Sequence, residues 1–399
     1  MNNLLRLYES YRNMSLPVRR SNRIVSQRNW HAPDYVLLGV LGAIVVIGIV
    51  MLSSASTVVG FEGFNDPNYY IKHQLLYGIL VGAVGFFVAS RLDYHIWDKL
   101  AFPLLVMTII ALLLVFIPGI GLGLKGANRW INLGAFTFQP AEMAKLTFLL
   151  YLSSWLQKRG GGIKSFSYGF LPFVVILSVL AGLIILEPDF STMLVLVFMS
   201  VAVFFVAGAN LVHMSWFGAI GAGLFLLIIK IAPYRAARFT VFLHPEMDPQ
   251  GIGYHINQAL LAIGSGGLFG LGLGHSRQKY NYLPEAHSDS IFAIISEELG
   301  FIFSVVLISL YLFLMVRGFR IARRAPDNFG KYIAVGITIW ITFQAVFNIA
   351  AMVGVVPISG IPLPFISHGS TAVAFSLIGM GILANISKQT VTAPAPERR

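Results

Sequence analysis

Ten stretches of this 399-residue sequence are apolar over about 20 consecutive residues, the length of helix that crosses about 30 Å of hydrocarbon. Only 11% of the residues are charged, whereas soluble domains carry charge on about a quarter of theirs. Together these observations predict an all-α polytopic membrane protein with about ten transmembrane helices and a large ordered extracytoplasmic loop. The predicted spans are residues 35–54, 73–90, 100–118, 140–157, 168–186, 190–208, 212–232, 289–316, 332–356 and 367–387.

The spans divide the chain into three regions. Residues 1–34 form a basic segment with no long apolar stretch and no small-residue cleavage site, which argues against a cleavable signal peptide. Residues 35–388 form the membrane domain, whose longest interruption is a loop at 233–288. This loop is rich in glycine and aromatic residues and is expected to be ordered, whereas residues 389–399 are expected to be a disordered tail.

The distribution of lysine and arginine predicts the orientation. Nineteen of the 28 basic residues fall on one side of the membrane if the N-terminus is inside. Cytoplasmic segments retain lysine and arginine, so both termini are expected in the cytoplasm. The net charge of +11 then reflects topology and contact with anionic lipids, and it does not indicate nucleic-acid binding.

The composition excludes several cofactor sites. The sequence has no cysteine, which rules out disulfides, thiolate zinc sites, iron–sulfur clusters and cysteine nucleophiles. Residues 121–126 fit a dinucleotide-binding pattern, but they follow a membrane span and lead into no βαβ unit. We therefore expect no nucleotide cofactor and no clear metal-ligand set; the carboxylates leave open a divalent cation, Mg²⁺ or Mn²⁺.

Ionisable groups in or beside a span are informative, because each costs about 2.5–3.5 kcal/mol to insert. Glu285, His287 and Asp289 stand at the outer mouth of the eighth predicted span. On a continuous helix Glu297 would lie about 80° round from Asp289 and about 12 Å deeper, so the two are predicted to line one cavity. The alternative is that Asp289 only caps the helix, a position that aspartate favours.

Other charged residues allow two interpretations each. Glu142 and Lys145, three apart on the fourth predicted span, can form an ion pair that neutralises itself or can contact substrate. Glu187 and Asp189 flank a proline between two spans, where turn formation is the simpler explanation.

Two arginines open the large loop. Arg235 and Arg238 could bind phosphate. They could equally anchor the chain at the lipid headgroups.

Three groups of residues resemble signatures of the SEDS family, the shape, elongation, division and sporulation proteins. The first comprises residues 126–131 and 139–142, and the third residues 363–370. The second is the longest, with residues 235–238, 242–245, 248–249, 253–254, 262–270, 283–289 and 297–300. Together the resemblance covers about residues 35–388.

The resemblance implies a peptidoglycan glycosyltransferase that polymerises lipid II, the undecaprenyl-diphosphate-linked disaccharide peptide, in the bacterial cytoplasmic membrane. It also implies a class B penicillin-binding protein and other divisome proteins as partners. Residues 284–287 and the long basic N-terminal segment are more similar to the division (FtsW-like) type, acting at the septum, than to the elongation (RodA-like) type.

The resemblance also suggests roles for individual residues. Asp289 is assigned as the general base on the hydroxyl of the acceptor sugar. The predicted substrate-binding residues are Arg129, Trp130, Gln139, Glu142, Lys145, Glu187, Asp189, Arg235, Arg238, Glu285, His287, Ser288, Glu297 and Ser367.

Two other functions stay open at the level of sequence. A transporter or flippase for the same lipid-linked precursor would also have ten spans and buried charges. A scaffold that only holds a penicillin-binding protein is disfavoured, because Asp289 is retained beside the hydroxyl of Ser288.

The sequence departs from the family pattern at two positions. Ser290 and His368 each stand where the family usually has an aromatic residue. These departures put local packing and substrate preference in question.

Overall fold

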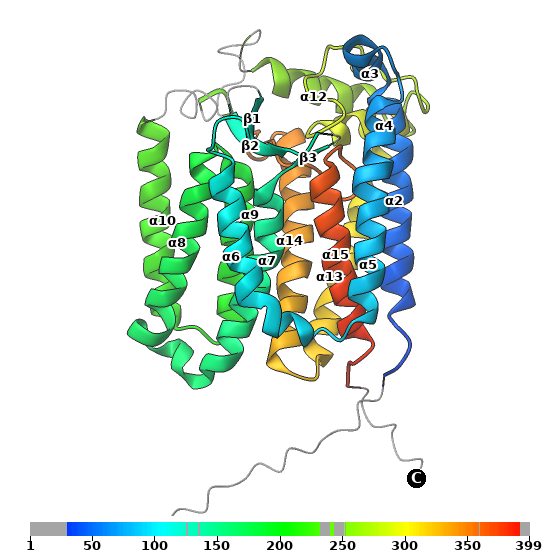
Figure 1. Ribbon diagram of the computed structural model, residues 1–399. Helices are drawn as coiled ribbons and strands as arrows, with labels where there is room; N and C mark the ends of the chain where they lie inside the picture. The colour runs from blue at the N-terminus through cyan, green and yellow to red at the C-terminus, as the bar shows by residue number, and fades with distance from the viewer. Residues whose placement is uncertain are drawn as a thin grey trace, which may run out of the picture. The chain divides into compact units, whose positions relative to one another are not determined.

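The computed structural model describes residues 30–124, 127–134, 136–231, 240–242, 251, 253–358 and 360–391. Within these residues, ten helical segments run side by side and form a bundle (Figure 1). Their bounds are α2 Tyr35–Ala55, α4, η1 and α5 together Tyr69–Arg91, α6 Ile96–Leu114, α7 Pro140–Arg159, η3 and α8 together Phe166–Leu186, α9 Phe190–Val206, α10 Leu211–Ile231, α13 Ile291–Arg324, α14 Asn328–Met352 and α15 Ser370–Ser387. The prediction of an all-α polytopic membrane protein is confirmed.

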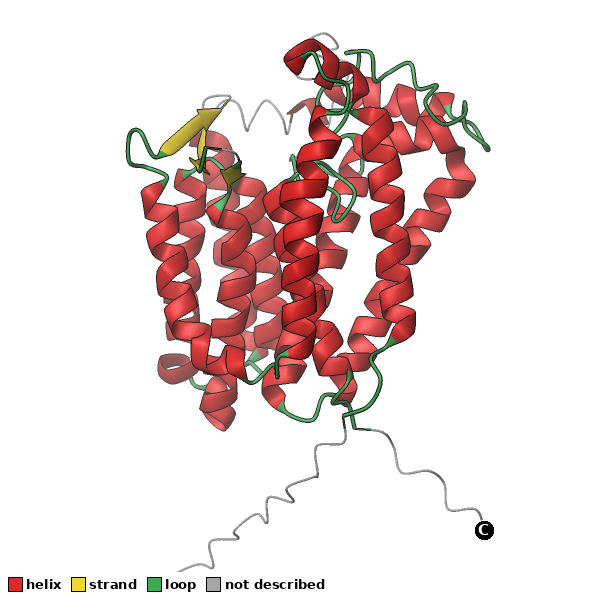
Figure 2. Ribbon diagram, turned by 45° about the vertical axis from the view of Figure 1, so that its right-hand side comes forward, coloured by secondary structure: helices red, strands yellow, loops and turns green. Residues whose placement is uncertain are grey.

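Short elements gather at one end of the bundle, which we call the strand end (Figure 2). They are helices α3 (Thr57–Phe64) and α12 (Tyr254–Ser265) and an antiparallel sheet of β1 (Gly121–Leu124), β2 (Ala127–Asn132) and β3 (Thr137–Phe138). At the opposite end, which we call the terminal end, a 3-10 turn (Gly160–Lys164) links α7 to η3. There the backbone N–H of Asp34 donates to Ser387 Oγ over 3.1 Å and ties the first span to the last.

Seven of the described helices are long and apolar enough to cross a membrane. The central helix α7 is not among them, as its weak apolar pattern in the sequence suggests. It packs against α6, α9, α14 and α15, and 15 of its 20 residues are buried. A helix enclosed by other helices faces little lipid and therefore tolerates polar side chains.

The predicted spans are shifted where polar residues begin a helix. The third was expected at 100–118 but runs from Ile96 to Leu114, because Asp98 lies in the first helical turn, where a carboxylate is favoured. The ninth was expected at 332–356 but is α14, which begins one turn earlier. Asp327 caps that helix by accepting a hydrogen bond from the backbone N–H of Gly330 over 2.7 Å.

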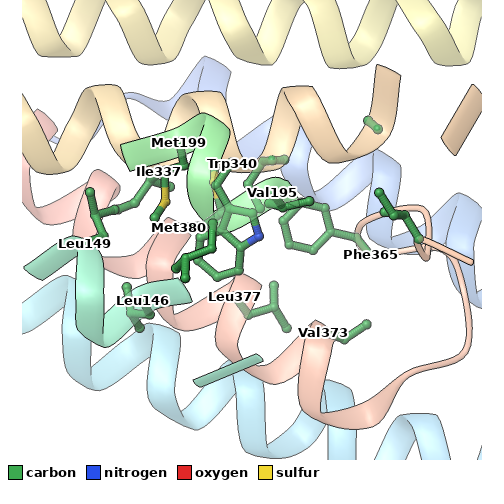
Figure 3. Packing of buried hydrophobic residues seen from close by; sticks show 14 of the residues in the cluster. Leu146, Leu149, Val195, Met199, Ile337, Trp340, Phe365, Val373, Leu377 and Met380 are labelled. Atoms are coloured by element: carbon green, nitrogen blue, oxygen red, sulfur yellow. The ribbon is translucent and has the colours of Figure 1, made fainter. Parts of the chain in front are cut away.

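Trp340 of α14 lies at the centre of the hydrophobic core and is fully buried. Its indole Nε1 donates to Gln344 Oε1 over 3.0 Å, so the one polar atom of the ring has a partner. The apolar side chains around it come from α7, α9, α14 and α15 (Figure 3): Leu146, Leu149, Val195, Met199, Ile337, Val373, Leu377 and Met380. This core fixes the helices whose ends carry the site described below.

Helix α13 is broken at Gly300, where φ is 78° and ψ is −178°. The segment 266–272 enters the break, because the N–H of Leu271 donates to Glu297 O and that of Phe301 donates to Gly267 O, over 3.0 and 2.9 Å. Non-helical backbone at membrane depth is tolerated where other protein groups satisfy its hydrogen bonds. Within the predicted loop 233–288, the described residues 253–288 contain α12 and the turns after it, and the segment that enters the break packs into the bundle.

At the terminal end His95 lies between two carboxylates. Its ring nitrogens are 2.7 Å from Asp93 Oδ1 and 2.7 Å from Asp327 Oδ2. The hydrogen bond to Asp327 raises the pKa of His95 above its usual value, against the opposing effect of burial. Burial alone would raise the pKa of Asp327, but hydrogen bonds, first that from His95, lower it. The pair of His95 and Asp327 links the α5–α6 loop to the start of α14.

We expect the protein to lose thermal stability as pH rises through the raised pKa of His95. A histidine with a raised folded-state pKa contributes its full stability below its unfolded value of about 6.5 and loses it above the folded value. Melting temperatures of the wild type and of His95→Gln between about pH 6 and pH 9 check this. The wild type should lose more stability than the variant, and parallel curves would contradict the assignment.

Candidate functional site

A cavity of about 720 Å³ lies at the strand end. Its wall comes from residues 64–77, from 129–142, from the start of α9, and from the segments 285–289 and 360–372. Nine of the predicted site residues line it: Arg129, Trp130, Gln139, Glu142, Asp189, Glu285, His287, Ser288 and Asp289. Residues far apart in the sequence therefore meet around one space.

Asp289 lies just before α13 and is 8% exposed. Ser290 occupies the N-cap position of that helix, so Asp289 is one residue outside it. The two carbonyls that precede Asp289 are held by the segment before α15. Ser367 Oγ donates to Ser288 O over 2.6 Å, and the N–H of His368 donates to His287 O over 2.9 Å.

A tight turn brings Glu285 to the same cavity. Its φ of 51° lies in the left-handed region, which is uncommon for a residue with a side chain. Its carbonyl accepts from the N–H groups of Ser288 and Ser290, over 2.9 and 3.3 Å. Backbone strain of this kind persists only where its surroundings impose it, and it is common near functional sites.

Glu142 and Lys145 form the predicted ion pair. Lys145 Nζ lies 2.8 Å from Glu142 Oε2, and both side chains are buried. The same ammonium donates to Gln344 Oε1 over 3.1 Å and lies 4.9 Å from the centre of the Trp340 ring. Glu142 lines the cavity, whereas Lys145 is not among the lining residues. Lys145 therefore holds the lining residue Glu142 in place without lining the cavity itself.

Arg129 holds the turn that carries Glu187 and Asp189. Its Nε donates to Glu187 O over 3.0 Å, and its Nη2 donates to the carbonyl of Pro188. Asp189 accepts from Gln139 Nε2 over 2.9 Å and caps α9 by accepting from Thr192 N over 3.1 Å. The predicted turn and the predicted site residues are thus parts of one network.

Glu187 is fully buried, and neither carboxyl oxygen has a hydrogen-bond partner among the described residues. Burial raises its pKa to about 9, the neighbouring carboxylate of Asp189 adds to the increase, and Arg129 opposes it. Glu187 is therefore protonated at neutral pH. It is not among the residues that line the cavity.

The prediction that Glu297 lines the cavity with Asp289 is wrong. Glu297 accepts from Ser276 Oγ over 2.5 Å and from the N–H of Arg277 over 3.0 Å, and it is not among the lining residues. Asp289 precedes α13, so the helical angle assumed between the two residues does not apply. Glu297 holds the loop after α12 in place.

Two predicted diphosphate-binding residues, Arg235 and Arg238, lie outside the described residues.

Among the residues that the structure describes, no three histidine or acidic side chains are grouped as metal ligands would be.

The family of the chain follows from comparison with known proteins. The family model described as a cell cycle protein of the FtsW, RodA and SpoVE type matches residues 34–392. The chain belongs to this family. Its sequence is 42% identical over 361 residues to a Trichlorobacter lovleyi protein named probable peptidoglycan glycosyltransferase FtsW, across 90% of this chain and 94% of that one. It is 40% identical over 357 residues to stage V sporulation protein E of Bacillus subtilis, across 90% and 97% of the two chains.

Two solved structures share the fold. One belongs to a peptidoglycan synthase complex described as coordinating polymerization and crosslinking, with a TM-score of 0.73 and 29% identity. That similarity covers 90% of this chain and 98% of the other. The rod shape-determining protein RodA of Thermus thermophilus has a TM-score of 0.67 and 28% identity, over 92% of this chain and all of RodA.

The two departures from the family pattern have local explanations. Ser290 is fully buried and hydrogen-bonds to His255 Nε2 over 2.6 Å and to Pro284 O over 2.8 Å. His368 lines the cavity with its ring 4.9 Å from that of Tyr70, so a ring is still present there. Burial lowers the pKa of His368 to about 3, and neighbouring histidines add to the decrease, so its imidazole is neutral.

Aromatic residues of the second span also line the cavity, and the sequence analysis does not identify them. Tyr69, Tyr70, His73 and Tyr77 line the cavity from the second span, and Phe136 stacks on Tyr77 with ring centres 5.2 Å apart. Residues 69, 73 and 77 are spaced by four and so share one helix face. The spacing in the sequence predicts that these aromatic side chains share a helix face, but it does not predict which loops pack against that face.

Proposed function

We propose that this protein is a peptidoglycan glycosyltransferase that polymerises lipid II, with Asp289 as the general base. The observation that carries the proposal is the position of Asp289 in the wall of a cavity at one end of a membrane bundle. The family and the names of its relatives support the substrate class.

The reaction joins two lipid-linked sugars. The 4-hydroxyl oxygen of the acceptor sugar forms a bond to the anomeric carbon of the donor, and the bond from that carbon to the lipid diphosphate breaks. The diphosphate leaves with the bonding electron pair, and the hydroxyl proton passes to the Asp289 carboxylate. A positioned base of this kind typically contributes about 10²- to 10⁴-fold in rate.

Arginine side chains are proposed to bind the lipid diphosphate, which needs positive charge. Arg129 has five N–H donors, two of which bind the carbonyls of Glu187 and Pro188, so others remain for diphosphate oxygens. Arg235 and Arg238 are further candidates for that role. Protonated Glu187 adds no negative charge near the diphosphate.

The ring-bearing residues complete the site. Trp130 and the lining residues Tyr69, Tyr70 and Tyr77 suit the apolar faces of sugar rings, and Gln139 and Asp189 offer polar contacts. Glu285, His287 and Ser288 surround the base from its own loop.

We further propose that the protein acts with a class B penicillin-binding protein at the division septum. The fold similarity to a chain of a synthase complex that coordinates polymerization and crosslinking supports a partner that crosslinks the product. The relative named FtsW supports the division role over the elongation role.

Both termini are proposed to be cytoplasmic, so that the cavity faces outward. Cysteines introduced at Asp66 and Gly267 should then react with an impermeant thiol reagent in intact cells. Cysteines at Gly161 and Arg323 should react only after lysis, and the cysteine-free background removes competing thiols. Labelling of Gly267→Cys only after lysis would overturn this orientation.

The activity is tested with purified protein and lipid II in detergent. Translocation cannot occur without a bilayer, so this assay measures polymerisation alone. We expect a ladder of products longer than lipid II from the protein with its partner. Unchanged lipid II would contradict the proposed function.

A further inference from the structure

Asn348 of α14 makes a direct link to the backbone of Asp289. Its Nδ2 donates to Asp289 O over 2.7 Å and to Ile361 O over 2.7 Å, and its side chain is buried. Its Oδ1 has no hydrogen-bond partner among the described residues. The two N–H groups of the amide therefore join two segments of the cavity wall, those that contain Asp289 and Ile361.

The segments joined by Asn348 meet at the carboxylate itself. Gly360, which precedes Ile361, has a φ of 70°, and a Cβ there would lie 3.6 Å from Asp289 Oδ2. The carbonyls of His287 and Ser288 are held by the same segment before α15. Three successive carbonyls, 287 to 289, thus accept hydrogen bonds, and the one at Asp289 is bound by a side chain of a membrane-spanning helix.

We infer that Asn348 is a positioning residue that fixes the Asp289 loop against residues 360–361. This inference rests on the proposed function, because a base must lie within hydrogen-bond reach of the proton that it accepts. Loss of the link lets the loop move relative to the facing wall. A displacement of about 1 Å in a reacting group can cost about 10²-fold in rate.

Asn385 provides a matched control. It is fully buried on α15, its Nδ2 donates to Ser90 O over 3.0 Å, and its Oδ1 accepts from Tyr94 N over 3.1 Å. It lies at the terminal end, away from the cavity. Asn385→Ala therefore removes a buried asparagine link of the same kind without touching the Asp289 loop.

The test compares Asn348→Ala with Asn385→Ala in the full-length protein with its partner. Hydrogen exchange of peptides covering 287–290 and 360–363 should increase in Asn348→Ala alone. The kcat for lipid II polymerisation should fall about 10- to 100-fold in that variant, with KM within about twofold. Asn348→Ser, which keeps one donor, should fold if Asn348→Ala does not, and should show the same pattern with a smaller fall.

A double-mutant cycle separates positioning from general damage. In an Asp289→Asn background the base is already lost, so adding Asn348→Ala should change the residual rate by less than about twofold. An equal fall in both backgrounds, an equal fall in Asn385→Ala, or unchanged exchange at 287–290 would overturn the role of Asn348 alone. A wild-type protein that makes no glycan would instead overturn the proposed function, and the positioning role with it.

Discussion

Asp289→Asn is expected to lower the rate of lipid II polymerisation at least about 100-fold, the lower limit for loss of a general base. Asparagine has the size and shape of aspartate but does not accept the proton from the attacking hydroxyl. The backbone hydrogen bonds to residues 287–289 do not involve the carboxylate, so folding and partner binding should be retained. Initial rates of glycan formation, with the melting profile as a check on folding, measure this effect.

Two variants control for the charge change. Asp66 lies at the same end of the molecule, is not among the cavity-lining residues and pairs with exposed Lys72 over 2.7 Å. Asp66→Asn should therefore leave the rate within about twofold, because exposed ion pairs contribute little. Glu142→Gln should lower the rate less than Asp289→Asn does. A folded Asp289→Asn that polymerises near the wild-type rate would exclude Asp289 as the base.

Lys145→Met is expected to have the largest effect on stability. Removal of one partner from a buried ion pair typically costs about 3–5 kcal/mol, because the other charge is left buried without compensation. Here that charge is Glu142, whose side chain is 3% exposed. Methionine is close to lysine in length and offers the Trp340 ring a thioether in place of the ammonium, so the loss reports mainly on charge. The yield of folded protein and its melting temperature in detergent measure the effect.

Two comparisons show whether the charge is the cause. The double variant Glu142→Gln, Lys145→Met has no buried charge at this pair and should recover most of the lost stability. Lys72→Met makes the same substitution in an exposed ion pair and should cost less than about 1 kcal/mol. A double variant as unstable as Lys145→Met would show that packing, and not the unpaired carboxylate, dominates.

The membrane fold could be predicted because the length of an apolar run is a local property. Ten runs of about 20 residues correspond to the ten helical segments, including the central α7. The ends of the spans are harder to predict from the sequence, because a polar residue interrupts the apolar run although it can lie in the first turn of the helix. Asp98 and Asp327 lie at such helix starts.

The site was only partly predictable because its geometry depends on non-local contacts. Glu285, His287, Ser288 and Asp289 are predicted site residues from their position and their resemblance to a family signature, and all four line one cavity. Glu297 was misplaced because a continuous helix from Asp289 was assumed, whereas α13 begins at Ile291. The role of Asn348 depends on contacts with residues 59 and 13 positions away, which no spacing rule within one helix reveals.

The most direct measurement follows polymerisation and translocation together. Proteoliposomes would hold the protein with its partner and lipid II labelled in one leaflet, with Asp289→Asn in a parallel sample. The account predicts that the wild type makes glycan chains and that Asp289→Asn, equally folded, makes at most about one hundredth as much. Movement of labelled lipid II between leaflets without any glycan, in the wild type and in Asp289→Asn alike, would contradict the account and identify a flippase.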